Sequence, residues 1–146
     1  MKKYGLALVV AAVIIAIVLF PSEKKRIKKV IRTCEQAVIN ENSKALMSLI
    51  SFNYSDNHGG SYLTLKNRSK RLYKTYDDFE FIVEIVEITV NEGEAVADLK
   101  VSLIASAGNE RGYLLGDAEG HQEIKVYFEK EKLGWRIIRL DKEEHS

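Results

Sequence analysis

The stretch from Phe79 to Leu103, FEFIVEIVEITVNEGEAVADLKVSL, decides the fold, because its apolar residues recur at every second position. A period of two is typical of a β-strand that buries one face. The polar positions change face after Ile85, which predicts a β-bulge or sharp bend between Ile85 and Glu87. Turn-forming residues at Asn91–Glu94 predict a hairpin. The inward face of the second strand is expected to be wholly apolar: Ala95, Ala97, Leu99, Val101 and Leu103.

Two more strands are predicted after this hairpin. Apolar and polar residues alternate again over residues 123–129, and a turn at Glu131–Gly134 leads to a final strand from Trp135 to about Leu140. The intervening segment, Ala107–Gly120, is rich in glycine and is expected to be flexible. The second half of the chain therefore predicts an antiparallel meander of about four strands.

The residues before the sheet have helical spacing instead. Between Ser22 and Ile39 the apolar residues recur in steps of three and four, and Ser22 is expected to cap this helix. A shorter helix is predicted from Ser43 to Ile50, and a third from Ser61 to about Thr75. Helices followed by antiparallel strands are the order of an α+β fold.

The N-terminal segment is apolar on all sides. Gly5–Phe20 contains no charge, and Tyr4 with a snorkelling Lys3 extends it towards the about 17 residues that are the lower limit for a membrane span. Because the segment ends in bulky residues, an uncleaved signal-anchor is favoured over a cleavable signal peptide. The expected organisation is an N-terminal transmembrane helix within residues 1–21, a folded domain at 22–141 and a polar tail at 142–146.

The expected partner of Tyr4–Phe20 is a lipid bilayer, which predicts a single-pass protein of the cell membrane. Lysines and arginines directly after the segment count towards a cytoplasmic domain under the positive-inside rule. The opposite orientation is favoured here, because a cytoplasmic domain would require a terminus with two lysines to cross the bilayer. Five of these cations are expected to reach anionic lipid headgroups: Lys24, Lys25, Arg26, Lys28 and Lys29.

Composition and charge exclude several classes of protein. With 46% hydrophobic and 29% charged residues, the chain is not intrinsically disordered, and a net charge of +1 gives no general reason to expect a polyanionic partner. Nucleic acid is not expected beside a membrane tether. The single cysteine, Cys34, excludes an internal disulfide and is expected to pack in the core. No spacing of metal-ligating residues is present, so no metal or other cofactor is predicted.

The helices and the closing segment Gly134–Arg139, GWRIIR, together resemble the nuclear transport factor 2-like superfamily, which includes ketosteroid isomerase and scytalone dehydratase. The resemblance covers about Ser22–Leu140. It implies a cone in which about three helices pack in the concave face of a curved, mainly antiparallel sheet, with a pocket at the wide end. It also implies small bacterial relatives with a membrane anchor, and homodimers formed through the sheet.

Enzymes of that superfamily place acids or Asp/His pairs in the pocket, whereas the inward faces predicted here are apolar. Proton transfer needs a titratable group within reach of the reacting atom. The favoured function is therefore a non-catalytic module for ligand binding or protein assembly, with an envelope protein as one partner. The alternative is a small-molecule enzyme of the isomerase or dehydratase type, with a pocket near Asp56 and His58.

Seven residues are candidates for a pocket or a contact surface. Asp56 and His58 form either an acid/base pair at the pocket mouth or an Asx-turn with a solvated imidazole. Tyrosines can line a pocket for an apolar ligand. An apolar triplet flanked by glycines, Tyr113–Leu115, predicts a lid, a partner contact, a strand edge or simple docking on the core. The candidates are Tyr54, Asp56, His58, Tyr62, Tyr113, Leu114 and Leu115.

Overall fold

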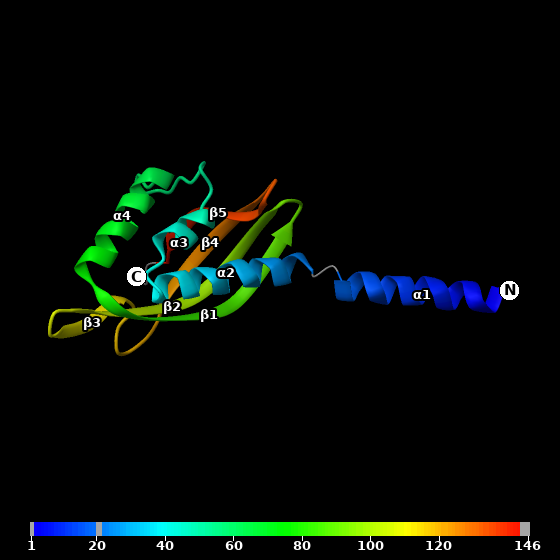
Figure 1. The fold of residues 1–146 in the computed structure, drawn as a ribbon, viewed down its shortest axis with the longest axis horizontal. Coiled ribbons are helices and arrows are strands. Elements are labelled where there is room, and N and C mark those ends of the chain that lie inside the picture. The colour runs from blue at the N-terminus through cyan, green and yellow to red at the C-terminus, as the bar shows by residue number, and fades with distance from the viewer. Residues whose placement is uncertain (1, 20–21, 144–146) are drawn as a thin grey trace.

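The hairpin predicted around Asn91–Glu94 forms the longest ladder of the sheet. In the computed structural model, which describes residues 2–19 and 22–143, β1 (Asp77–Asn91) pairs antiparallel with β2 (Glu94–Ala107) (Figure 1). The register shifts between Ile85 and Glu87, which confirms the predicted bulge.

The other strands extend the sheet on the far side of β2. There β2 pairs with β4 (Gln122–Glu131), and β4 pairs with β5 (Gly134–Lys142), so that the order is β1-β2-β4-β5. All of these pairings are antiparallel. The α+β class and the antiparallel meander predicted from the sequence are confirmed.

A fifth strand lies in the segment that was expected to be flexible. β3 (Glu110–Leu115) pairs antiparallel with the end of β2, from Leu103 to Ala107. The prediction of four strands was wrong here for a non-local reason. β4 pairs with β2 only as far as Val101, so the end of β2 keeps unpaired backbone groups, and β3 satisfies them.

Two of the predicted helices have the expected bounds. α2 (Glu23–Ile39) begins after Ser22, whose side chain accepts a hydrogen bond from the Lys25 amide. α4 (Tyr62–Thr75) begins after Ser61, which exchanges hydrogen bonds with Thr64 in a capping box. These caps satisfy backbone donors that a helix start otherwise leaves free.

The short helix begins where it was predicted but ends earlier. α3 (Ser43–Ser48) is capped by Asn42, whose side chain accepts a hydrogen bond from the Ala45 amide. It ends before Ile50 because the chain there joins the edge of the sheet: Ile50 forms a parallel bridge with Ile137, and the Ser51 amide donates to the Ile137 carbonyl.

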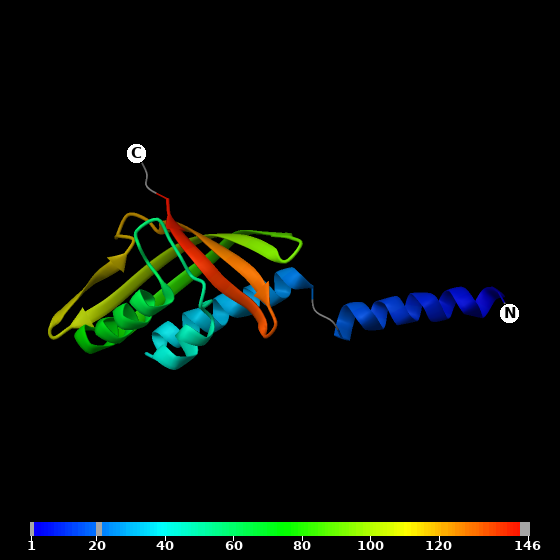
Figure 2. The same cartoon turned by 90° about the horizontal axis from the view of Figure 1, so that it is seen from above.

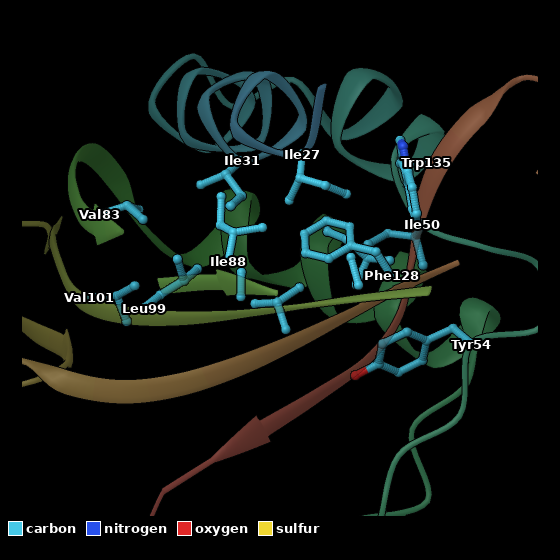
Figure 3. Packing of buried hydrophobic residues seen from close by; sticks show 14 of the residues in the cluster. Ile27, Ile31, Ile50, Tyr54, Val83, Ile88, Leu99, Val101, Phe128 and Trp135 are labelled. Atoms are coloured by element: carbon cyan, nitrogen blue, oxygen red, sulfur yellow. The ribbon is translucent and has the colours of Figure 1, made fainter. Parts of the chain in front are cut away.

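The core lies between the sheet and the helices on one of its faces. Figures 1 and 2 show α2, α3 and α4 on the same side of the curved sheet. Ile27 and Ile31 of α2 point towards Phe128 of β4 and Ile88 of β1, and all four are buried (Figure 3). The apolar stripe of α2 is thus the main cover of the sheet near the hairpin.

α1 (Lys2–Leu19) extends away from this core (Figure 1). Leu8, Val9 and Val13 are among its exposed apolar side chains. No helix in the described part of the chain combines the length and apolar character that crossing a bilayer requires. The predicted transmembrane helix is therefore not supported. Two of the 18 residues of α1 are lysines, and the uncharged residues that remain fall below the lower limit of about 17 for a span. Residues 20 and 21, the end of the predicted anchor, lie outside the described residues.

One carboxylate fixes the start of α2 on the sheet. Glu23, the first residue of α2, accepts a hydrogen bond from the indole N–H of Trp135 and another from Lys130 Nζ at 3.1 Å. Trp135 is buried in β5, where an indole N–H without an acceptor would destabilise the fold. The hydrogen bonds from Trp135 and Lys130 hold the pKa of Glu23 below its usual value of 4.5.

We expect Glu23→Gln to remove a pH-dependent part of the stability. A carboxyl whose pKa is lowered in the folded state stabilises the fold above its unfolded pKa, and this stability is lost as the pH falls through the folded pKa. The difference in unfolding free energy between wild type and Glu23→Gln should therefore be constant near neutral pH and shrink as the pH falls below 4.5.

Urea unfolding followed by tryptophan fluorescence measures this difference, with Glu129→Gln on the exposed side of β4 as control. A difference that stays the same on both sides of that pH would show that Glu23 does not hold α2 in this way.

Candidate functional site

The helices and the sheet enclose an apolar cavity of about 420 Å³. Strands β1, β2 and β4 supply much of its wall through Val83, Leu99, Val101 and Val126. Among the described residues that line it there is no carboxylate and no imidazole, and Arg68 is the one charged side chain. A cavity of this size and composition suits an apolar ligand, since ligand sites typically measure about 300–1,000 Å³.

α4 forms the wall opposite the sheet. Its cavity-lining residues are Leu65, Arg68, Ser69 and Leu72, which are spaced three and four apart and so share one face of the helix. Ser69 is the only buried residue of α4. Its Oγ lies 3.1 Å from the hydroxyl of Ser43 on α3 and donates to the Lys66 carbonyl. α4 is thus tied to α3, while Leu65 and Leu72 are only partly buried: each packs against the core and also lines the cavity.

The thiol of Cys34 also lines the cavity, from α2. Burial, with a smaller contribution from the charge of Glu35, raises the pKa of Cys34 to about 11. The thiol is therefore protonated at neutral pH, and a protonated thiol is a poor nucleophile. Cys34 was predicted to pack in the core, and in the structure it also lines the cavity.

Asp56 organises the loop between α3 and α4. One carboxylate oxygen accepts a hydrogen bond from the Tyr54 hydroxyl at 2.8 Å, and the other accepts from the backbone amides of His58 at 2.9 Å and Gly60 at 2.8 Å. The latter bonds are those of an Asx-type turn, and the His58 side chain is exposed. A Cβ at position 60 would collide with the Asp56 carboxylate, so the turn requires glycine there.

The electrostatics of this loop fit a structural role. Partial burial of Asp56 opposes its ionisation, but the hydrogen bonds from Tyr54, Gly60 and His58 outweigh it and hold the pKa of Asp56 below its usual value. Burial, together with the bond to Asp56, raises the pKa of Tyr54 well above its ordinary range. None of these residues is among those that line the apolar cavity.

The other candidates are divided among the cavity, the core and the surface. Tyr62 packs against Phe52, with ring centroids 4.7 Å apart. On β3, Tyr113 is exposed, Leu114 packs against a small buried cluster below α4, and Leu115 lines the cavity. The triplet is a strand, one of the options that its sequence left open.

The sequence-based candidates did not include Arg68. Helical spacing from Leu65 to Leu72 could have revealed it, because that spacing places Arg68 on the apolar face of its helix.

Comparison with known families found no match, and comparison with curated proteins found none either. Solved structures do match. A nuclear transport factor 2-like superfamily protein of Salmonella enterica serovar Typhimurium superposes with a TM-score of 0.69 at 14% identity, over 85% of this chain and 92% of that chain. A protein of Novosphingobium aromaticivorans with a cystatin-like fold gives 0.65 at 13% identity, over 88% and 86% of the two chains.

A third similar structure, Bd1075 of Bdellovibrio bacteriovorus, gives a TM-score of 0.65 at 12% identity. There the match spans 84% of this chain and 40% of that chain. At such identities the likeness concerns the fold alone. The folded part of the chain has the nuclear transport factor 2-like, cystatin-like fold. This is the fold that the sequence of its helices and closing strand led us to expect.

The cavity leads us to expect that two paired positions on adjacent strands differ in how well they tolerate a larger side chain. Val126 on β4 lines the cavity, whereas its cross-strand neighbour Ala97 on β2 is fully buried and is not among the lining residues. We expect Val126→Phe to change the free energy of unfolding by less than about 1 kcal/mol, because the ring enters open space. Ala97→Leu should overpack the core and destabilise it by about 1–3 kcal/mol.

Urea denaturation of both variants measures the two costs. Equal losses of stability in Val126→Phe and Ala97→Leu would contradict the presence of open space beside Val126.

Proposed function

We propose that this protein is a membrane-associated module that binds an apolar molecule in the cavity between α4 and the sheet. The observation that carries the proposal is the wall itself: a volume of about 420 Å³ bounded mainly by aliphatic and aromatic side chains, with Arg68 as the one charged lining residue. Water gains few hydrogen bonds in such a space, and apolar cavities of this kind stay dry or take up apolar ligands. Transfer of an apolar ligand from water into this cavity is therefore favourable.

The chemistry of the lining supports binding as the function. The thiol of Cys34 has a raised pKa, and the acid/base pair considered from the sequence, Asp56 and His58, belongs to a loop outside the lining. Fold alone does not determine activity. The binding proposal therefore rests on the side chains of the cavity and not on the names of similar structures.

The membrane part of the proposal rests on α1 and the cations that follow it. Apolar side chains of α1 between Leu6 and Ile15 are exposed, and exposed apolar surface costs about 25 cal/mol per Å² in water. Inserting α1 into the apolar region of a bilayer removes this cost without requiring that it span the membrane. The cations of α2 nearest to α1, such as Lys24, Lys25 and Lys28, are exposed and would each add about 1 kcal/mol at an anionic lipid surface. We place the folded part on the extracytoplasmic side.

Ligand binding is tested with the neutral fluorophore N-phenyl-1-naphthylamine. The full-length protein in zwitterionic nanodiscs should bind the fluorophore saturably, above the uptake of empty nanodiscs. Val126→Phe should weaken this binding by about tenfold or more, corresponding to at least about 1.4 kcal/mol. Ile82→Phe, a change of similar size on the exposed side of β1, is the matched control and should leave binding unchanged. Equal binding by the wild type and Val126→Phe would locate the fluorophore elsewhere and refute the proposed site.

Membrane association is tested by flotation with phospholipid vesicles. The wild type should float with vesicles, more completely when they contain phosphatidylglycerol, and the double variant Val9→Lys/Val13→Lys should remain in the dense fraction. The control Ile82→Lys/Val86→Lys changes two exposed apolar residues of the sheet and should float like the wild type. A wild type that stays in the dense fraction with both kinds of vesicle would overturn this part of the proposal.

A further inference from the structure

Building on the proposed ligand-binding function, we propose that the ligand is a single-chain amphiphile with an anionic head, a carboxylate or phosphate monoester, which Arg68 recognises at the edge of the cavity. The first observation is the position of Arg68. It lies between Leu65 and Leu72 on the face of α4 that lines the cavity, where an amphipathic helix otherwise carries apolar residues. The residue is exposed overall and the lining surface is almost wholly apolar, so the aliphatic stem of Arg68 lines the cavity and its guanidinium lies at the solvent edge.

The second observation is that the guanidinium of Arg68 has no partner among the residues that the structure describes. Arg32 donates to the Val83 carbonyl, and Arg111 and Arg139 form ion pairs with aspartates. In the part of the chain that the structure describes, no hydrogen bond or ion pair is formed by the side chain of Arg68 or of Arg71. Of these two, Arg68 alone lines the cavity. A planar guanidinium with unused donors is suited to bidentate binding of a carboxylate or phosphate.

The third observation is the charge of α4. The helix contains five lysines and arginines and no acidic residue in its sequence YLTLKNRSKRLYKT. The field around Arg68 is therefore positive, which favours an anion over a neutral head and disfavours a cation. Because α4 contains no acidic residue, no carboxylate of its own helix competes with a ligand for the guanidinium of Arg68.

The shape of the site favours one chain. Its volume of about 420 Å³ lies at the lower end of the range for ligand sites, about 300–1,000 Å³. Apolar walls surround the space behind Arg68, so an alkyl chain would run inwards from the head along Val101 and Val126. Each further methylene should strengthen binding by about fourfold, the equivalent of about 0.8 kcal/mol, until the cavity is full.

Cys34 provides a readout located inside the site. It is the single cysteine of the chain and lines the cavity, so a bound alkyl chain should shield its thiol from methyl methanethiosulfonate. The full-length protein is studied in zwitterionic nanodiscs at pH 9. At this pH more of the thiol is ionised and can react with the reagent, and the carboxylate and phosphate heads of the ligands are charged. Modification is followed by the mass of the intact protein. Dodecanoate, dodecyl phosphate, dodecanol and dodecyltrimethylammonium are compared at equal concentrations below micelle formation.

In the wild type, dodecanoate or dodecyl phosphate should slow the modification of Cys34 several-fold more than dodecanol does. Dodecyltrimethylammonium should slow it least of all. Arg68→Gln should abolish the advantage of the anions while keeping the protection by dodecanol. Arg71→Gln removes a cation from the same helix outside the lining and should behave like the wild type. Displacement of N-phenyl-1-naphthylamine by the same four compounds gives the comparison independently of thiol reactivity.

The outcomes separate the two proposals. Equal effects of dodecanol and the anions in the wild type, or an anion advantage that survives in Arg68→Gln, would overturn head-group recognition and leave apolar binding intact. If none of the compounds protects Cys34 or displaces the fluorophore, the proposed ligand-binding function fails as well. A preference for dodecyl phosphate over dodecanoate would identify a phosphorylated lipid, and the reverse would identify a free fatty acid.

Discussion

The arrangement of this protein depends on one constraint: the apolar face of the β1–β2 hairpin has to be covered, and the helices cover its two ends unequally. Near the hairpin turn, α2 buries Ile27 and Ile31 against the sheet, with its start fixed by the bonds from Trp135 and Lys130 to Glu23. At the other end, α4 has one buried residue, Ser69, and is tied to α3. The apolar cavity is the space that this incomplete cover leaves.

The same constraint explains which parts of the structure could be predicted from the sequence. The bulge after Ile85 and the start of α4 at Ser61 depend on local patterns, namely a change of polar face and a capping residue, and both were predicted correctly. For β3, a strand edge at Tyr113–Leu115 was one of several options, and no local pattern could choose among them. β3 forms because β2 continues beyond the end of β4, and that mismatch becomes visible only when the strands are paired.

The candidate site shows the same division between local and tertiary signals. An Asx-type turn at Asp56 was one of the two interpretations of its sequence, and the hydrogen bonds to His58 and Gly60 have that form. Helical spacing places Arg68 on the apolar face of α4, but that this face borders a cavity becomes visible only when α4 is positioned relative to the sheet. For α1, hydropathy and a length extended by Tyr4 and Lys3 predicted a span, but no helix of the described residues is long and apolar enough for one.

The central claim is that the space beneath α4 takes up an apolar molecule. Xenon tests it most directly, because this gas is neutral, small and enters dry apolar cavities. In methyl NMR spectra recorded under increasing xenon pressure, the signals of Leu99, Val101 and Val126 should shift and saturate, while Ala97 should not respond. Small shifts of all methyl groups that increase linearly with pressure would contradict the account.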